Sequence, residues 1–229
     1  MKKKTSESPL DSVVYIEIPE HLAKKFSQVI EKDVLIPFQL PDGILRIEDF
    51  DISSLTLEMI LSGMLILFAH KRTHKHIEHY RKIFTEIRPN IKDEMLKAIT
   101  VKIQNKDYDM AENLLESLIG FDEKDLNIRL TQAYLYEEIG KEDKEYREKA
   151  CAIYDYLIGI EPPFPPVFFN AAIFFIEEKN YKRAKDLLET YIALKIDDED
   201  EVTKVEKAQE ALNYLNSQII DDKNFQKAI

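Results

Sequence analysis

Four of the five histidines in this 229-residue chain lie within ten residues of one another, at His70, His74, His76 and His79. The pairs His70/His74 and His76/His79 have the i,i+4 and i,i+3 spacings that place two side chains on one face of a helix. Glu78 adds a carboxylate between them. Imidazole nitrogens and a carboxylate oxygen are ligands that Zn²⁺ or Ni²⁺ accepts, so this window is a candidate metal site.

The same window also contains cationic residues. Lys71, Arg72 and Lys75 alternate with the histidines, and their positive charge opposes the binding of a metal cation. We therefore predict a solvated turn at this window and no metal. A metal-dependent enzyme that uses the four histidines is kept as an alternative.

The single cysteine, Cys151, is the other residue that could carry chemistry. A catalytic thiol needs a lowered pKa and a nearby base, whereas Glu148 and Asp155 bring negative charge toward Cys151. The chain has no glycine-rich phosphate-binding loop. We therefore predict a non-catalytic protein that has no cofactor, and we interpret Cys151 as a packing residue.

Composition narrows the choice of partner. The 43 acidic residues outnumber the 32 basic ones and give a net charge of −11, which disfavours nucleic acid and anionic lipid surfaces as partners. The most apolar stretch, residues 55–69, includes Glu58 and is shorter than the roughly 20 residues that a bilayer core requires. One cysteine cannot form an internal disulfide, which suits a reducing compartment. We expect a cytoplasmic protein with no membrane association.

The N-terminal part combines strand and helix signals. Residues 13–18 are β-branched and aromatic, which is typical of a strand, and residues 20–31 have the apolar spacing of a short amphipathic helix. Residues 34–40 and 44–47 flank Pro41-Asp42-Gly43. Because glycine accepts the positive φ of tight turns, this pattern predicts a β-hairpin over residues 34–47.

From residue 54 onward, one helical register accounts for most of the chain. The eighth position of a unit of about 34 residues is occupied by Leu65, Ile99, Ala133 and Ala172. The twentieth position is occupied by Ile77, Ala111, Ala150 and Ala184. Successive positions are 34 residues apart, except for one step of 39 residues whose five extra residues fall in the charged turn 140–145. Small residues at these two positions let two antiparallel helices approach closely, so the register predicts stacked helical hairpins.

The last two units carry the fullest pattern. Ala133, Tyr136, Gly140, Ala150, Tyr154 and Pro162 are followed in the next unit by Ala172, Phe175, Tyr181, Ala184 and Leu188. This series of small, aromatic and turn residues resembles the tetratricopeptide repeat (TPR) family. The resemblance covers residues 58–198 and is weaker in the first two units. It implies a helical solenoid that binds a protein or peptide in a concave groove.

The resemblance also implies which side chains line that groove. The groove positions are Leu96, Thr100, Ile103, Leu130, Tyr134, Glu137, Phe169, Ile173 and Ile176, with Asn170 and Glu177 beside them. An alternative is that the N-terminal module or the C-terminal helix fills the groove. The carboxylate clamp with which some family members hold chaperone C-termini needs basic residues and Asn at set positions. Only Asn170 fits such a clamp, and we therefore reject a cochaperone role.

The predicted organisation is a mainly α protein with a TPR-like solenoid and a small α+β module. It acts as an adaptor or scaffold for a protein or peptide partner that the sequence does not identify. The alternative is a structural protein that self-associates through the edge of the 34–47 hairpin, with a homodimer as the candidate assembly. The predicted segments are a flexible tail (1–11), the α+β module (12–53), four hairpins within 54–198 (58–91, 92–125, 126–164 and 165–198), and a C-terminal capping helix with a tail (199–229).

Overall fold

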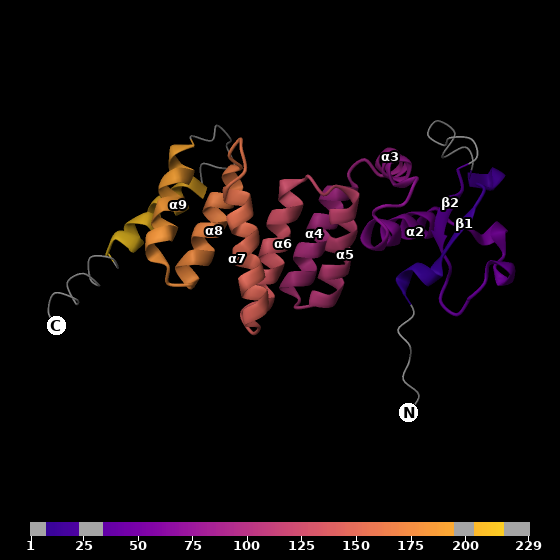
Figure 1. Ribbon diagram of the computed structural model, residues 1–229, viewed down its shortest axis with the longest axis horizontal. Coiled ribbons are helices and arrows are strands. Elements are labelled where there is room, and N and C mark those ends of the chain that lie inside the picture. The colour runs from indigo at the N-terminus through magenta and orange to yellow at the C-terminus, as the bar shows by residue number, and fades with distance from the viewer. Residues whose placement is uncertain (1–7, 23–33, 195–203, 218–229) are drawn as a thin grey trace, which may run out of the picture. The chain divides into compact units, whose positions relative to one another are not determined.

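The computed structural model describes residues 8–22, 34–194 and 204–217 (Figure 1). The described part is mainly helical and contains one two-stranded sheet, which confirms the predicted mainly α class. The chain divides into an N-terminal unit, Met1–Thr131, and a C-terminal unit, Gln132–Ile229. The division falls within helix α6 (Leu126–Ile139).

The sheet of the N-terminal unit pairs two segments that are distant in sequence. After a 3₁₀ turn, η1 (Pro9–Ser12), strand β1 (Val13–Ile16) runs antiparallel to β2 (Ile36–Gln39), with Val13 opposite Gln39. η1 lies partly within the predicted tail. Of the helix predicted over residues 20–31, only residues 20–22 are described, and they are helical; the rest lies outside the described residues.

The predicted 34–47 hairpin is wrong in its second strand. The turn itself is present, because Gly43 has a φ of 86° and the Ile44 amide donates to the Pro41 carbonyl at 3.1 Å. Residues 44–46 then form no strand, and two 3₁₀ turns follow, η2 (Ile47–Asp49) and η3 (Ile52–Ser54). Leu45 is 77% exposed, so this segment does not pack well, whereas β1 offers β2 a continuous β-branched and aromatic partner.

Helix α2 (Leu57–His70) is the centre of the N-terminal unit. Thr56 caps it by accepting a hydrogen bond from the Met59 amide at 3.3 Å. Its sequence is apolar nearly all round because β2 covers one side and helix α5 (Tyr108–Phe121) covers another. α2 is 14 residues long, and no helix in the described part of the chain is long and apolar enough to cross a membrane.

Two glycines make these close approaches possible. A Cβ atom added to Gly63 on α2 would lie 2.6 Å from the Phe38 Cα of β2. A Cβ added to Gly120 on α5 would lie 1.7 Å from the Phe68 carbonyl oxygen of α2. Only a residue without a side chain fits either position. The backbone of α2 therefore packs directly against the backbones of β2 and α5, with no side chain between them at these two positions.

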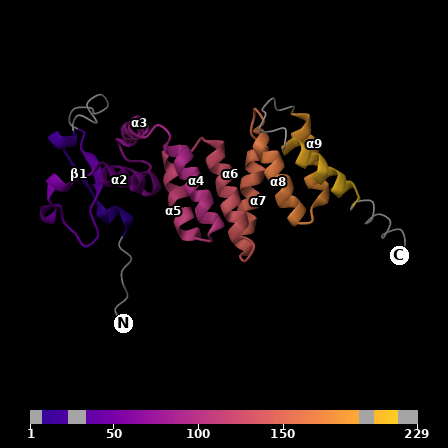
Figure 2. The same cartoon turned by 180° about the vertical axis from the view of Figure 1, so that it is seen from behind.

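Helix α3 (Ile77–Ile87) does not run back along α2, although residues 58–91 were predicted as one hairpin. It crosses the end of α2, as both views show (Figures 1 and 2). The contact there is aromatic: the ring centroids of Phe68, Phe84 and Phe121 lie 5.4–5.5 Å apart and join α2, α3 and α5. The helix that packs along α2 is therefore α5 and not α3.

In each unit, the described part contains a closely packed pair of consecutive helices. In the N-terminal unit, α4 (Ile91–Gln104) packs along α5 through an apolar face that includes Ile99 and Ala111. In the C-terminal unit, α8 (Pro165–Glu177) packs along α9 (Tyr181–Ala193), with Ala172 and Ala184 both fully buried. The small buried residues Ala111, Ala172 and Ala184 let the helices of each pair approach closely.

The same connector links the helices of both pairs. Lys106 and Lys179 have φ values of 59° and 57°, in the left-handed region. The following amide, that of Asp107 or Asn180, donates to the carbonyl five residues earlier at 2.9 or 2.8 Å. This is a Schellman motif, which satisfies the last carbonyl groups of a helix. The two connectors lie at matching positions of the predicted register.

The C-terminal unit also includes α7 (Lys144–Ile158) and the helical residues 204–217. Gly140 permits the tight turn before α7, since an added Cβ would lie 2.8 Å from the Arg147 amide nitrogen. In the predicted capping helix, Leu212 and Leu215 are buried and Val205 is partly buried. Val202 and the acidic run 197–201 lie outside the described residues.

Candidate functional site

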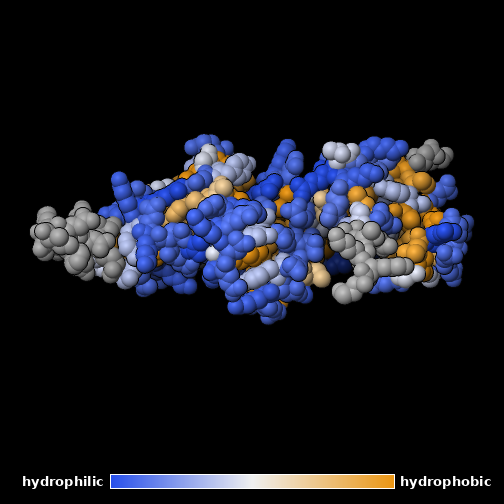
Figure 3. Space-filling view, turned by 60° about the horizontal axis from the view of Figure 1, so that its bottom comes forward, coloured by the Kyte–Doolittle hydropathy of each residue, from blue (hydrophilic) through white to orange (hydrophobic). Residues whose placement is uncertain are grey.

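The predicted groove residues are divided between the two units. On the face drawn in Figure 3, hydrophobic residues reach the surface in separate patches among hydrophilic ones. In the N-terminal unit, Leu96, Thr100 and Leu130 are partly exposed, whereas Ile103 is 2% exposed and offers little surface. The Thr100 hydroxyl donates to the Leu96 carbonyl at 2.9 Å. This group of residues therefore offers a partner mainly Leu96 and Leu130.

In the C-terminal unit, more of the predicted positions keep exposed surface. Tyr134 on α6 and Phe169, Ile173 and Ile176 on α8 are partly exposed, so their apolar surface is only partly used in packing. The Phe169 ring packs 5.5 Å from the Tyr191 ring on α9, which fixes its orientation. The neighbouring core positions Ala133 and Phe168 are buried.

The two polar members of this set differ in how much they can offer a partner. Asn170 is exposed, but its side-chain amide donates to the Pro166 carbonyl of its own helix at 2.7 Å. Glu177 is exposed and lies 3.8 Å from the Arg147 guanidinium. Arg147 is also paired with Glu178.

Glu137 is the unusual residue of the site. It lies on α6 with only 8% of its surface exposed, and the Tyr154 hydroxyl of α7 donates a hydrogen bond to its carboxylate at 2.9 Å. Burial, with a smaller contribution from the negative charges of Glu177 and Glu138, raises the pKa of Glu137 to about 7, against the lowering effect of the Tyr154 hydrogen bond. At neutral pH the carboxyl is therefore close to half-protonated.

Lys141, a cation close to this carboxyl, already has another partner. The charge of Lys141 reaches Glu137, but its amine is bound to Glu138 at 2.5 Å. The Tyr154 ring packs 5.2 Å from Phe174, which closes the apolar side of the pair. A buried carboxyl without a dedicated cation is costly when ionised. The arrangement is therefore suited to accept a positive charge from outside the unit.

Sequence reasoning found Glu137 but not its partner. Tyr154 was predicted only as a packing aromatic, whose burial is confirmed. Its spacing from Glu137 across the α6–α7 turn was a usable signal, since both residues fall on facing helices of one predicted hairpin.

The histidine window does not form a metal site in the structure. Within the described residues, no three His, Cys, Asp or Glu side chains lie so that they could hold a metal ion. The imidazoles of His74, His76 and His79 instead surround the ring of Tyr80, at centroid distances of 5.4–6.4 Å. His70 is exposed at the end of α2. The tyrosine therefore occupies the centre that a metal would need.

Cys151 is half-buried on α7, and its thiol donates a weak hydrogen bond to the Asp155 carboxylate at 4.0 Å. Burial raises the pKa of its thiol, and the charge of Asp155 raises it further. This is opposite to the shift that a nucleophilic thiol needs.

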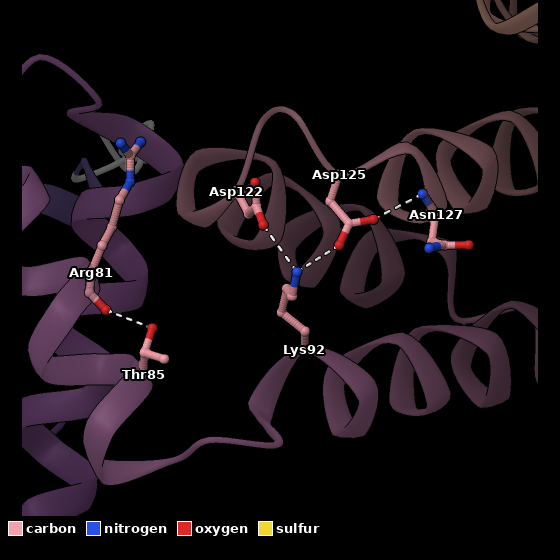
Figure 4. Close-up of polar contacts among 6 residues, drawn as sticks. All are labelled: Arg81, Thr85, Lys92, Asp122, Asp125 and Asn127. Atoms are coloured by element: carbon pink, nitrogen blue, oxygen red, sulfur yellow. Dashed lines mark hydrogen bonds and ion pairs between the residues drawn. The ribbon is translucent and has the colours of Figure 1, made fainter. Parts of the chain in front are cut away.

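A cleft of about 340 Å³ lies beside α3 and the end of α5 in the N-terminal unit. Arg81 spans it, because its guanidinium donates to the Gly120 carbonyl at 2.6 and 3.2 Å and to Glu78 at 2.5 Å. The Thr85 hydroxyl donates to the Arg81 carbonyl at 2.9 Å (Figure 4). The Arg81 guanidinium is therefore used to satisfy a carbonyl group at the C-terminal end of α5.

Lys92 plays a similar structural part at the start of α4. Its amine donates to Asp122 at 2.9 Å and to Asp125 at 2.6 Å (Figure 4). These hydrogen bonds, with Asp125 the stronger cause, raise the pKa of Lys92. Asp125 also accepts from the Asn127 amide at 2.9 Å, at the start of α6. These groups are satisfied within the protein, so we assign them to stability and not to binding.

Comparison with known proteins gives no relative from which to transfer a function. No family model matches the chain, and no curated protein and no solved structure matches it. The resemblance to the TPR family therefore stays a prediction that rests on the residues.

Proposed function

We propose that this chain is a non-catalytic adaptor or scaffold of the TPR-like solenoid type, and that its C-terminal unit binds a segment of a partner protein. The binding surface is the acid-edged strip, which we define as Tyr134, Glu137, Phe169, Ile173, Ile176 and Glu177. The observation that carries the proposal is the buried carboxyl of Glu137, one helical turn from the partly exposed ring of Tyr134 on α6. Such a carboxyl costs the folded chain stability when it is ionised, which favours a role for it in binding.

The chemistry of the strip defines the partner. Phe169, Ile173 and Ile176 would take apolar side chains, since partly exposed aromatic and aliphatic groups are the usual anchors of an interface. Glu137 and Glu177 would take a lysine or arginine side chain, whose charge relieves the cost of ionising Glu137. The net charge of −11 favours approach of a basic segment. The occupant is therefore a peptide segment that combines apolar residues with at least one cationic residue.

Competing surfaces are less suited to this role. Self-association through the edge of a 34–47 hairpin would have to use β1 or β2 instead, because that hairpin does not form. β2 contains Pro37, which cannot donate a hydrogen bond to an added strand.

The test is affinity capture from cell lysate with the full chain, followed by peptide tiling of the captured proteins. The variant Tyr134→Ala with Phe169→Ala should lose the captured partner while its melting transition stays nearly unchanged, because both residues are partly exposed. Tyr156→Ala with Tyr214→Ala removes two rings that are 62% and 54% exposed elsewhere in the unit, and should keep the partner. Phe168→Ala should instead melt early, since truncating a buried Phe costs about 3–5 kcal/mol.

The tiled peptides then test the predicted chemistry. Peptides that bind should contain a lysine or arginine, and replacing it by norleucine or citrulline should weaken binding about tenfold or more, as expected for a charge-assisted hydrogen bond. Glu137→Gln should remove that difference. A partner retained by Tyr134→Ala with Phe169→Ala, or binding peptides without any cationic residue, would contradict the proposal.

A further inference from the structure

A second cavity lies in the N-terminal unit, and none of the predicted groove residues lines it. It has a volume of about 310 Å³ and lies between β1, the residue preceding β2, and the loop that joins α2 to α3. We call it the ring pocket and define it by its lining residues, Tyr15, Leu35, His74, Lys75, His76 and Tyr80. Small-molecule sites span roughly 300–1,000 Å³, so this pocket is sized for a ligand built on a single ring.

Stacked rings form its wall. His74 stacks on Tyr15 with a centroid distance of 5.6 Å and an angle of 11° between planes, and on Tyr80 at 5.4 Å and 29°. The Tyr80 hydroxyl is held by donation to the Leu35 carbonyl at 2.8 Å. The wall is therefore fixed by packing and hydrogen bonding before any ligand arrives, which lowers the entropic cost of binding.

The rim of the pocket is positively charged although the chain is strongly acidic. Arg72 in the same loop is paired with Glu116 at 2.5 Å, whereas Lys71 and Lys75 form no ion pair with any described residue. The Tyr15 hydroxyl likewise has no hydrogen-bond partner within the described segments. Glu78, the nearest acid in sequence, is bound to Arg81. Among the described residues, the donors left for a ligand at this pocket are therefore Lys75, His76 and the Tyr15 hydroxyl, with the charge of Lys71 nearby.

We propose that the ring pocket binds a small aromatic anion, meaning one ring that carries a phosphate or a carboxylate. The ligand ring packs against the walls formed by Tyr15 and Tyr80, where stacked and edge contacts between aromatic groups are favourable. The anionic group lies at the rim, where Lys75 and His76 donate charge-assisted hydrogen bonds to it. This site is independent of the acid-edged strip and takes a ligand of the opposite charge.

The neighbouring imidazole supports this assignment. Burial lowers the pKa of His74, and the charges of Lys71, His76 and Lys75 lower it further. His74 therefore serves at neutral pH as an uncharged ring within the stack, while the positive charge stays at the rim. The separation of an uncharged aromatic wall from a cationic rim matches the two halves of the proposed ligand.

The experiment is an NMR titration of the ¹⁵N-labelled full chain with phenyl phosphate and with benzoate. Inorganic phosphate and phenol serve as half-ligands. We expect saturable shifts of the amides of residues 74–76 with phenyl phosphate or benzoate, at an affinity at least about tenfold tighter than for either half-ligand. Lys75→Gln should weaken binding about tenfold. Lys97→Gln, an exposed lysine on α4 with no ion pair among the described residues, should leave binding unchanged.

Three results would overturn the proposal. One is the absence of saturable binding by both aromatic anions in the folded wild-type chain. Another is equal binding by inorganic phosphate and phenyl phosphate, or no change in Lys75→Gln, because either would mean simple ion attraction. The third is a phosphotyrosine peptide that binds far more tightly than phenyl phosphate, since the occupant would then be a protein residue and not a small molecule. Lys75 is an exposed loop residue, so its variant is expected to fold normally.

Discussion

The helical pairs α8–α9 and α2–α3 show two ways in which consecutive helices of one chain can be arranged. α8 and α9 are joined by a Schellman connector with Lys179 at positive φ, and they bury Ala172 and Ala184 completely. α2 and α3 are joined by the longer segment 71–76, which has no residue at positive φ, and the matching positions hold Leu65 and Ile77. The α8–α9 hairpin therefore has both the connector and small residues at the matching positions, whereas α2–α3 has neither.

The α2–α3 region replaces these features with glycines placed elsewhere. Gly63 lets α2 approach β2, and Gly120 lets α5 approach α2. The apolar surface of α2 is thus covered by elements that are distant in sequence. The comparison shows that two elements approach closely where one of them lacks a side chain at the contact. Large apolar side chains determine only which face of a helix is buried.

The substitution with the largest expected effect breaks the α2–α5 contact. Gly120→Ala places a Cβ only 1.7 Å from the Phe68 carbonyl oxygen. Because the clashing atom belongs to the backbone, it has little room to adjust. We expect a loss of at least about 3 kcal/mol, at the upper end of overpacking effects. Urea denaturation at constant m-value measures it.

Gly159→Ala is the matched control for that experiment. Its added Cβ would make only ordinary contacts, at 3.6 Å or more, and its φ of −82° suits alanine. We expect no loss, and a gain of up to about 1 kcal/mol through the unfolded state. Equal effects of the two substitutions would show that the α2–α5 approach is not as close as the structure describes.

The sequence could predict most of the helices, because apolar residues recur at helical spacing and polar turns separate them. It could not predict the neighbour of α2. Periodicity identifies the face of a helix that is buried but not the element that covers it. The single glycine in the run 114–121 was the only sequence feature that pointed to the close approach of α5 to α2. The strand pairing failed for a similar reason. A turn at Gly43 suggested a local hairpin, whereas side-chain packing selected β1 as the partner of β2.

A second contrast lies within the C-terminal unit, between the apolar α8–α9 contact and the buried carboxyl of Glu137. The pKa of this group is about 7 in the folded chain against an ordinary value of 4.5. Below about pH 4.5 both states are protonated, and the group has no effect on stability. Between pH 4.5 and 7 only the folded state keeps the proton, so stability falls as pH rises, and above pH 7 the full cost of about 3 kcal/mol remains.

Glu137→Gln should therefore stabilise the protein above pH 7 by up to about 3 kcal/mol and leave it unchanged near pH 4. The amide oxygen of glutamine can still accept the Tyr154 hydrogen bond. Thermal melts from pH 4 to pH 8 measure the effect, with Glu142→Gln at an exposed turn position as the control. Parallel pH profiles for wild type and Glu137→Gln would show that the carboxyl is not desolvated in the folded state.

The candidate site was predictable in its positions but not in its chemistry. The register placed Tyr134, Glu137 and Ile173 outside the tight packing. It set Glu137 and Tyr154 on facing helices, but it gave no sign that the carboxyl would be buried. The histidine window shows the opposite limit. Its spacing suggested ligands, yet the ring of Tyr80 lies among the histidines, and aromatic packing of that kind depends on tertiary structure.

A smaller effect is expected from overfilling the α8–α9 contact. Ala172→Leu adds three carbons to a fully buried position and should cost about 1–3 kcal/mol. Ala152→Leu makes the same change at an exposed position of α7 and should cost little. The urea midpoints of the two variants measure the difference. An unchanged midpoint for Ala172→Leu would remove the predicted register.

The smallest expected effect concerns the connector that distinguishes the two arrangements. A non-glycine residue in the left-handed region costs roughly 1–2 kcal/mol. Replacing it by glycine removes this cost, but part of the gain is lost because glycine has a higher conformational entropy in the unfolded state. Lys179→Gly should therefore stabilise the α8–α9 pair by about 0.5–1 kcal/mol, whereas Lys179→Ala, which keeps a Cβ, should not. Thr73→Gly in the α2–α3 segment should destabilise by a similar amount, because no positive φ is needed there. Calorimetric melting of the three variants measures these signs. If glycine raised stability equally at both positions, the connector would not explain why α8–α9 closes into a hairpin and α2–α3 does not.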